Sequence, residues 1–329
     1  MSEATPILEV RGLTKYFPTR GGLLHAVENV NFKVYPGKTL GVVGESGCGK
    51  TTVGRLIIQL VEATGGDILF NGQSILKLEK KERREIYKKI QMIFQDPYSS
   101  LNPRLTVGDI IADPLKAMDP EMRKKKNSAR LKEAVLKVMD EVGLPESYYY
   151  SYPHELDGGR RQRIGLARAL VLEPQFIIGD EPVSALDVSV QAQILNLMMD
   201  LQEKKKISYL FITHNLLVVK HISDEIMVMY MGQVVEYAKK EDLFEDPRHP
   251  YTKALLEAIP MPDLSARKLG RNILKGEVTN PINPKPGCRF ASRCEFATEK
   301  CVGCDIPLRE VSSGHLVACV LESGNMDKE

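Results

Sequence analysis

Residues 44–51, which read GESGCGKT, combine glycines, a lysine and a hydroxyl in the spacing G-x-x-x-x-G-K-[ST]. Glycine allows the backbone to fold into a loop whose N–H groups point inward, and such a loop binds phosphate oxygens. Lys50 can reach the outer phosphates of a nucleotide and Thr51 can bind Mg²⁺. The bland alternative is a glycine-rich turn with a chance lysine, but an apolar run precedes the loop and a helical pattern follows it, as the motif requires. The residues predicted to contact the nucleotide here are Gly44, Glu45, Ser46, Gly47, Cys48, Gly49, Lys50, Thr51 and Thr52.

A second group is the acid pair Asp180 and Glu181, which ends the apolar run QFIIGDE. One carboxylate at a strand end can hold Mg²⁺ through water, and its neighbour can polarise an attacking water molecule. Apolar strands often end in charge, so the pair alone says little. Because this acid pair follows a phosphate loop in the chain, the sequence predicts that Asp180 binds Mg²⁺ and that Glu181 is the general base.

Five of the six cysteines form a third group, at residues 288–319, with gaps of five, six, two and fourteen residues. In a reducing compartment, clustered cysteines favour a metal site over disulfides. Zinc sites usually present two closely spaced cysteine pairs, whereas iron–sulfur clusters accept more varied spacing. The spacing alone therefore predicts metal binding over free thiols and leaves zinc and iron–sulfur open.

The elements that must position these groups alternate between strands and helices. Alternating polarity indicates half-buried strands, and short apolar runs indicate buried parallel strands. Strands separated by helices imply an α/β fold with a mainly parallel sheet. Strands are expected at residues 7–17, 25–34, 38–44, 173–181 and 206–214, and helices at 50–61, through most of 96–172, and at 189–205.

Length and composition limit the class of protein. The 329 residues, 43% of them hydrophobic, suffice for one large domain and an appendage. A formal net charge of +2 gives no support for nucleic-acid binding through a basic surface. With no secretory signal and no apolar run of ~18 residues, a soluble cytoplasmic protein is expected. Beyond about Pro260 the chain is rich in Pro, Gly and polar residues, which predicts one domain over 1–260 and a linker with the cysteine-rich region over 261–329.

These motifs, together with HELDGGRRQRIGLARAL at 154–170, give the chain a resemblance to the ATP-binding subunits of ABC transporters over about residues 7–235. The resemblance implies a P-loop ABC ATPase with a mainly parallel core sheet, an antiparallel β edge, a helical subdomain at about 96–172 and a small cysteine-rich tail. It also implies that Gln95 senses Mg²⁺ and the attacking water, that His214 contacts the γ-phosphate, and that Phe17 stacks on adenine. Alone, Gln95 and His214 would be an ordinary loop glutamine and a structural histidine. Their joint placement around two phosphate motifs reverses both interpretations.

A narrower resemblance, to oligopeptide and dipeptide permease ATPases, covers nearly the whole chain. It rests on PYSSLNPR at 97–104, on DPRHPYTKALLEAIP at 246–260 and on the spaced cysteines, although HPYT alone could simply cap a helix. It implies hydrolysis of ATP to power di- or oligopeptide import at the cytoplasmic face of the membrane. The implied partners are a second ATPase subunit, two transmembrane permease subunits and an extracytoplasmic binding protein, with no nucleic acid. The alternatives are import of an oligosaccharide or nickel by the same machinery, or a soluble regulatory ABC ATPase.

For the cysteines, the same resemblance implies a 4Fe-4S cluster. The pattern GCxFxxRCxxAxxxC followed by AC selects Cys288, Cys294, Cys301 and Cys319 as ligands. Cys304 falls outside the pattern and would be spare. His315, four residues before Cys319, is a weaker candidate.

The signature motif departs from the family pattern Leu-Ser-Gly-Gly-Gln, because it reads Leu156, Asp157, Gly158, Gly159, Arg160. In the family this motif binds the γ-phosphate held by the partner subunit, so Asp157, Gly158 and Gly159 are expected to contact nucleotide. Charge repulsion at ~4 Å and an effective dielectric near 20 is on the order of 4 kcal/mol per unit charge, whereas the lost neutral hydrogen bond is worth about 1 kcal/mol. We interpret this as a sign of a heterodimer with one weak site. The alternative is that Asp157 points aside and the glycines suffice.

Overall fold

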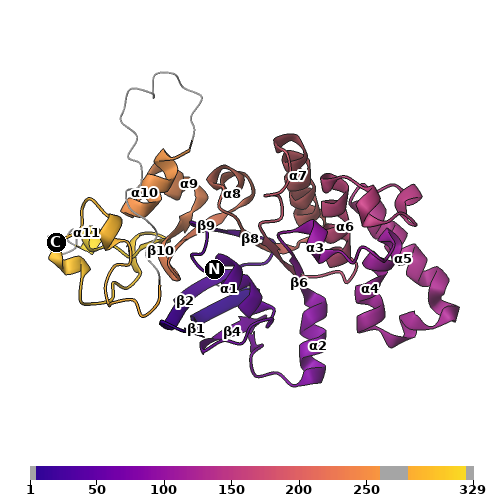
Figure 1. Ribbon diagram of the computed structural model, residues 1–329, viewed down its shortest axis with the longest axis horizontal. Coiled ribbons are helices and arrows are strands. Elements are labelled where there is room, and N and C mark those ends of the chain that lie inside the picture. The colour runs from indigo at the N-terminus through magenta and orange to yellow at the C-terminus, as the bar shows by residue number, and fades with distance from the viewer. Residues whose placement is uncertain (1–4, 260–280, 324–329) are drawn as a thin grey trace. The chain divides into compact units, whose positions relative to one another are not determined.

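The computed structural model describes residues 5–259 and 281–323, so most of the linker predicted beyond Pro260 lies outside the described residues (Figure 1). The chain divides into two compact units. Unit 1 comprises Met1–Leu8, Val34–Lys38 and Leu69–Ile212, and unit 2 comprises Glu9–Lys33, Thr39–Ile68 and Thr213–Glu329. The domain boundary at residue 260 stays a prediction. The structure groups the P-loop and the described cysteines in the same unit.

Unit 1 is built on a parallel sheet in which β7 (Phe176–Asp180) pairs with β6 (Ile90–Ile93) on one side and β8 (Ser208–Ile212) on the other. Every residue of β7 and β8 is buried, as expected for parallel strands covered on both faces. Parallel strands end at the same edge of a sheet. The residues that follow β6 and β7 therefore meet at that edge.

Helices make up most of the remainder of unit 1, and α4 packs against both α5 and α6. Side chains cap the N-termini of α4 and α7: Thr106 accepts the Asp109 N–H at the start of α4, and Asp187 accepts the Val190 N–H at the start of α7. The helices are α2 (Lys80–Lys89), α3 (Pro97–Ser100), α4 (Val107–Met118), α5 (Ser128–Glu141), α6 (Gly158–Leu170) and α7 (Val188–Lys205), and the short strand β5 (Gln73–Ser74) lies before α2.

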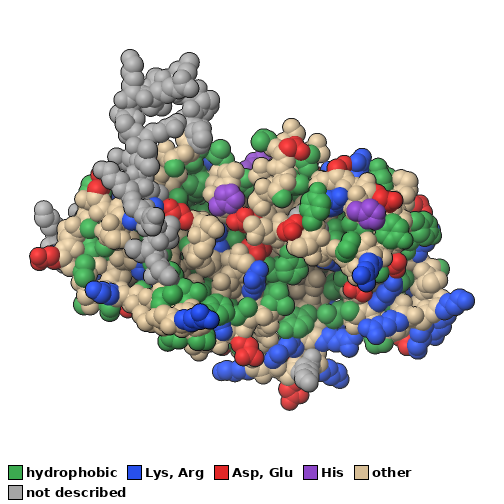
Figure 2. All heavy atoms as spheres, in the orientation of Figure 1, with side chains coloured by type: hydrophobic (Ala, Val, Ile, Leu, Met, Phe, Trp, Pro, Cys, Tyr) green, Lys and Arg blue, Asp and Glu red, His purple; other side chains and the backbone are tan. Residues whose placement is uncertain are grey.

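The basic run at residues 123–126 is a solvated face of unit 1. All four of its side chains are exposed. Lys124 and Lys126 both pair with Glu121. Figure 2 shows many Lys and Arg side chains, with fewer Asp and Glu side chains among them, along the lower right of the molecule, as on an ordinary charged exterior.

Unit 2 contains the strand order β11-β12-β10-β9-β3, parallel between β3 and β9 and antiparallel elsewhere. A second sheet has the order β2-β1-β4. The strands are β1 (Leu8–Thr19), β2 (Gly22–Val34), β3 (Thr39–Val43), β4 (Gly65–Phe70), β9 (Glu225–Tyr230), β10 (Gln233–Lys239), β11 (Arg309–Ser312) and β12 (His315–Val317). The helices are α1 (Lys50–Ile57), α8 (Leu216–Ile222), α9 (Lys240–Glu245), α10 (Pro250–Glu257) and α11 (Val320–Ser323).

The cysteine-rich tail of unit 2, described over residues 281–323, forms part of this sheet. β12 pairs with β10, with Glu236 opposite Val317, and the Ala318 N–H donates to the Val235 carbonyl at 2.9 Å. The next residue is Cys319, so the pairing fixes its place. Figure 1 shows the tail beside β10 and α10.

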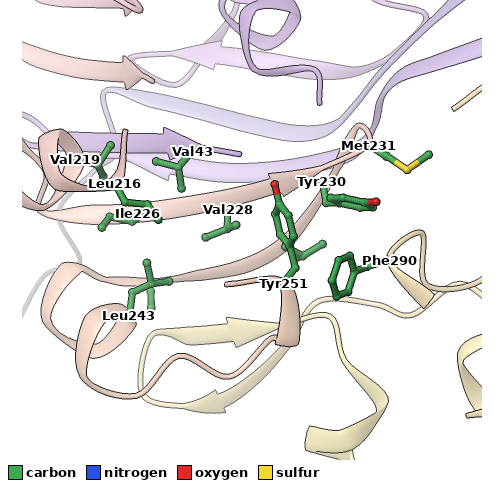
Figure 3. Packing of buried hydrophobic residues seen from close by; sticks show 12 residues of the cluster. Val43, Leu216, Val219, Ile226, Val228, Tyr230, Met231, Leu243, Tyr251 and Phe290 are labelled. Carbon is green, nitrogen blue, oxygen red and sulfur yellow. The ribbon is translucent and has the colours of Figure 1, made fainter. Parts of the chain in front are cut away.

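Aromatic packing anchors the tail as well. The rings of Tyr230 (β9), Tyr251 (α10) and Phe290 (tail) meet at centroid distances of 4.7 Å and 5.3 Å, and each ring is at most 2% exposed (Figure 3). Burying a side chain such as Phe290 stabilises the fold by about 1.5–3 kcal/mol.

The predicted fold is confirmed, with parallel core strands, antiparallel edge strands and a helical region at about 96–172. The helix predicted over 50–61 is shorter and ends at Ile57, because Gln59 adopts a left-handed backbone with φ +56°. The elements outside the predicted ranges include α2, α8, α9, α11, β4, β5, β6, β9, β10, β11 and β12. Among the described residues, no helix combines the length and apolarity needed to span a bilayer.

Candidate nucleotide and thiol sites

The P-loop of unit 2 connects β3 to α1 through backbone that only glycine adopts easily. Gly44 has φ +154° and Gly49 has φ +103°. A Cβ at Gly44 would lie 2.1 Å from the Met229 carbonyl oxygen, and one at Gly49 would lie 2.2 Å from that of Ala26. Both positions therefore need glycine for conformation and for space.

Lys50 and the start of α1 give this loop its positive charge. Lys50 is 4% exposed, and its Nζ donates to the carbonyls of Gly44 at 2.7 Å and Glu45 at 2.9 Å. No side chain caps α1 through Gly49, and its first turn carries no acid. The helix terminus and the ammonium group both favour an anion, which fits phosphate. Burial raises the pKa of the Cys48 thiol, so Cys48 is a packed neutral side chain beneath the loop.

The other nucleotide residues predicted in unit 2 are Phe17, Thr51 and His214. Phe17 is half-buried, with Lys15 Nζ 4.9 Å from its ring centroid. His214 is exposed and directly precedes Asn215, whose side chain caps α8 by accepting the Leu217 N–H at 3.0 Å. Thr51 lies in the first turn of α1. Their contacts with nucleotide stay predictions.

Unit 1 brings three predicted residues together at the edge where β6 and β7 end. The Gln95 amide donates to the Glu181 carboxylate at 3.0 Å. Asp180 is 2% exposed at the end of β7. This places an amide and two carboxylates at one edge, which suits Mg²⁺ and water.

Glu181 occupies an unusual backbone conformation, with φ +47°. A non-glycine residue in this region is strained by about 1–3 kcal/mol unless its surroundings hold it there. The surroundings do so here: the Glu181 N–H donates to the Ile212 carbonyl at 2.8 Å, and the Ser184 hydroxyl donates to the Glu181 carbonyl at 3.0 Å. Strain maintained in this way is typical of functional positions.

The signature carboxylate is bound within its own helix. Asp157 is the N-cap of α6 and accepts the Arg160 N–H at 2.8 Å. Its other oxygen forms an ion pair with the Arg160 guanidinium. Arg160 also lies 5.1 Å from the Tyr148 ring centroid. The alternative raised from the sequence, in which Asp157 points aside, agrees with this capping geometry, and Arg160 offsets part of the charge.

Four of the six cysteines line a single cavity in the tail of unit 2. They are the four selected from the sequence, Cys288, Cys294, Cys301 and Cys319. The Cys288 N–H donates to the Cys301 carbonyl at 2.8 Å, which holds those two segments together. Cys304 is exposed and does not line the cavity. Burial raises the pKa of the Cys288 thiol to about 11 and also raises those of Cys294 and Cys319.

His249, the first residue of the HPYT stretch, lines the same cavity. Its Nδ1 accepts the Tyr251 N–H at 3.0 Å and so caps α10. The neutral ring therefore carries its proton on Nε2, and burial lowers the pKa of His249 to about 4. Within the part of the chain that the structure describes, this buried Nε2 has no hydrogen-bond partner.

His315 is not part of the cavity. Its Nε2 lies 2.7 Å from the Glu236 carboxylate, and both side chains are buried. His315, the weaker candidate ligand, therefore pairs with Glu236 and does not line the cavity.

Two residues that contact the P-loop were not predicted. The Tyr251 hydroxyl accepts the Glu45 N–H at 2.8 Å, and the Arg293 guanidinium binds the Glu45 carboxylate. They lie 206 and 248 positions from Glu45 in the chain. The signal in the sequence that could have indicated this contact is Arg293, the arginine of the pattern GCxFxxRC, because the predicted cluster gives it no function.

Comparisons with known proteins identify the family of this chain. Residues 27–184 match the ABC transporter family, and residues 235–301 match the oligopeptide/dipeptide transporter C-terminal region. The oligopeptide transport ATP-binding protein OppF of Haemophilus influenzae is 50% identical over 90% of this chain and 89% of its own length. The dipeptide transport ATP-binding protein DppF of the same organism is 47% identical over 97% and 98%, respectively.

Solved structures give the same answer for the fold. A dimeric bacterial ABC transporter cassette matches with a TM-score of 0.64 and 26% identity, over 71% of this chain and 98% of its own. CbiO1 from Clostridium perfringens, part of an ABC transporter complex, matches with a TM-score of 0.64 and 24% identity, over 74% and 92%. This chain belongs to the ABC transporter family of ATP-hydrolysing, ATP-binding proteins.

Proposed function

We propose that this chain is the ATP-hydrolysing subunit that powers import of di- or oligopeptides through an ABC transporter. The observation that carries the proposal is similarity along almost the whole chain to peptide import ATP-binding proteins, including residues 235–301. That region carries the HPYT stretch and three of the four cavity cysteines. The P-loop alone would support only nucleotide binding.

The catalytic roles follow the chemistry of each side chain. Lys50 neutralises charge that develops on the transferred phosphoryl group. Asp180, Thr51 and Gln95 are the residues that would hold Mg²⁺, which when bound would neutralise charge on phosphate oxygens. Glu181 accepts a proton from the attacking water, and the bond from Gln95 orients its carboxylate. His214 contacts the γ-phosphate, and Phe17 stacks on adenine.

The proposed assembly comprises this chain, a second ATPase subunit, two transmembrane permease subunits and an extracytoplasmic binding protein, at the cytoplasmic face of the membrane. We favour a heterodimer, because a partner with an ordinary signature would complete the site formed by this chain's P-loop. The signature of this chain, residues 156–160, would complete the partner's site less well. Copurification of one distinct second ATPase supports this arrangement, and a homodimer that is active alone contradicts it.

We further propose that Cys288, Cys294, Cys301 and Cys319 bind a 4Fe-4S cluster. The support is that these four thiols share a cavity from which Cys304 is absent, and that His249 offers a buried N–H donor of the kind that cluster sulfurs accept. In residues 5–259 and 281–323 no three His, Cys, Asp or Glu side chains converge as on a single metal ion. The cavity measures about 10 Å³, close to what one water needs. A cluster would therefore have to move its lining outward.

Transport is tested with the assembled complex in liposomes, supplied with its binding protein and ATP. We expect uptake of peptides coupled to ATP hydrolysis, and loss of both with Glu181→Gln. Uptake of nickel or an oligosaccharide without uptake of peptides would contradict the substrate class and leave the ATPase assignment intact.

The cluster is tested by iron and sulfide content and visible absorbance after anaerobic purification. Cys319→Ser should lose the cluster and Cys304→Ser should keep it. The opposite result would mean that the fourth ligand is wrong, and zinc in place of iron would refute the cluster.

A further inference from the structure

The tail of unit 2 supplies a charged side chain to the P-loop. The Arg293 guanidinium donates to both carboxylate oxygens of Glu45, at 2.8 Å and 3.1 Å. The Arg293 side chain is 5% exposed and that of Glu45 is 22% exposed. Bidentate pairing of this kind fixes orientation as well as charge.

Arg293 is held in place by the same aromatic core that anchors the tail. Its guanidinium lies 5.8 Å from the Tyr230 ring centroid and 5.9 Å from that of Phe290, and it donates to the Tyr230 hydroxyl at 3.3 Å. The Tyr251 hydroxyl accepts the Glu45 N–H. The backbone and the side chain of Glu45 are thus both bound by groups of this core. Figure 3 shows its three rings, Tyr230, Tyr251 and Phe290.

Glu45 poses an electrostatic problem for a phosphate loop. It brings a carboxylate into a loop that receives the most negative part of a nucleotide, and like charges a few ångströms apart repel strongly where water screens them poorly. Lys50 bonds to the carbonyl oxygens of Gly44 and Glu45 rather than to the carboxylate. The cation on the Glu45 carboxylate is Arg293.

We propose that Arg293 is a positioning residue of the nucleotide site: it neutralises and orients Glu45, and the tail thereby sets the affinity of the P-loop for ATP. This depends on ATP binding by the P-loop and not on the transported solute or the cluster. It makes the cysteine-rich tail a working part of the nucleotide site.

The experiment measures the Kd for ATP by calorimetry, with the full-length chain in its assembled complex and in a Glu181→Gln background that prevents hydrolysis. Arg293→Met should raise the Kd by about fivefold or more. The defect should shrink only slightly at high salt, because the Glu45 carboxylate is 22% exposed and salt screens a largely buried repulsion weakly. Arg293→Met combined with Glu45→Gln should restore the Kd to within about twofold, because the repelling carboxylate is gone. Arg309→Met, which removes an exposed tail arginine of β11, should leave the Kd unchanged.

An unchanged Kd in Arg293→Met would overturn the proposal. So would equally weak binding in the double variant, since a purely structural contact would not depend on the charge of Glu45. If Arg293→Met fails to fold, Arg293→Lys, which keeps the charge but loses the fork, should show a smaller rise that Glu45→Gln removes, and no rise would refute the idea. Equal iron content is expected in all variants. A weaker Kd found only where iron is lost would also count against Arg293.

Discussion

Two helices of this molecule, α1 in unit 2 and α6 in unit 1, both begin at glycine-rich motifs. They differ in the charged side chain at the N-terminus, which is a lysine at α1 and a carboxylate at α6. α1 starts after Gly49 with no capping side chain and with Lys50 as its first residue. α6 starts after Asp157, whose carboxylate accepts the Arg160 N–H and pairs with the Arg160 guanidinium. Both termini carry the positive end of a helix dipole.

The difference shows that a glycine motif does not by itself make a phosphate site. At α1, no side chain caps the positive terminus, and the Lys50 ammonium group, which donates to two backbone carbonyls, adds positive charge that favours an anion. At α6, a carboxylate of the same chain already takes up part of that capacity. Whether α6 still serves a partner's nucleotide depends on how fully Arg160 compensates Asp157.

The largest effect should come from removing the cation of α1. Lys50→Ala should lower ATP turnover of the assembled complex by about 10²–10³-fold, because charge stabilisation of the transferred phosphoryl group is lost. Lys253→Ala, at an exposed lysine of α10, is the control and should have normal turnover. Normal turnover of the Lys50 variant would contradict the view that α1, unlike α6, is equipped to bind phosphate.

Next in size is the backbone requirement. Gly49→Ala places a Cβ 2.2 Å from the Ala26 carbonyl oxygen at φ +103°, and it should lower the Tm by about 5 °C. Gly158→Ala meets only the flexible Leu186 side chain, at 3.3 Å, and should change the Tm by less than about 2 °C. Equal Tm shifts of the two variants in calorimetry would mean that Gly49 and Gly158 do not differ in their need for glycine.

A smaller effect is expected at Arg160. Arg160→Gln keeps the backbone cap but removes the cation beside Asp157, so turnover should fall by about two- to fivefold, the size of a half-exposed ion pair. Lys124→Gln, at an exposed pair with Glu121, is the matched control. A rise in turnover would show that Arg160 does not offset the carboxylate.

The smallest effect belongs to Asp157→Ser. Serine keeps the N-cap and restores a neutral donor, so turnover should rise, by about twofold, because Arg160 already offsets much of the repulsion. An unchanged or lower rate in the assembled complex would reject the idea of a weakened site.

The sequence predicted what lies close together in the chain. Residues 44–49 form the loop and residues 50–52 begin α1, as the motif predicts, and β7 carries Asp180 and Glu181 to the sheet edge as expected. The four cysteines selected from the sequence line one cavity and Cys304 does not, but their role as cluster ligands stays a prediction. The capping of α6 by Asp157 could have been predicted from the sequence, because Asp is a favoured N-cap residue. The resemblance instead suggested a contact between Asp157 and nucleotide.

Contacts between distant segments could not be predicted. The pairing of β12 with β10 and the bond from Arg293 to Glu45 join segments that are separated by roughly 80 and 250 residues, and no periodicity reports such contacts. The strained φ of Glu181 was hidden for the same reason, because the Ile212 carbonyl that holds it comes from another strand.

The pairing of β10 with β12 has a consequence for the nascent chain. β10 pairs with β9 on one side, and its other side is an open sheet edge until β12 arrives. An unpaired, largely buried strand invites pairing with other chains. The finished unit ends instead in the short β11, with Arg309 and Glu310 exposed. β12, which is synthesised after β10, therefore protects this sheet edge from aggregation, and a chain cut at residue 260 should be prone to self-association.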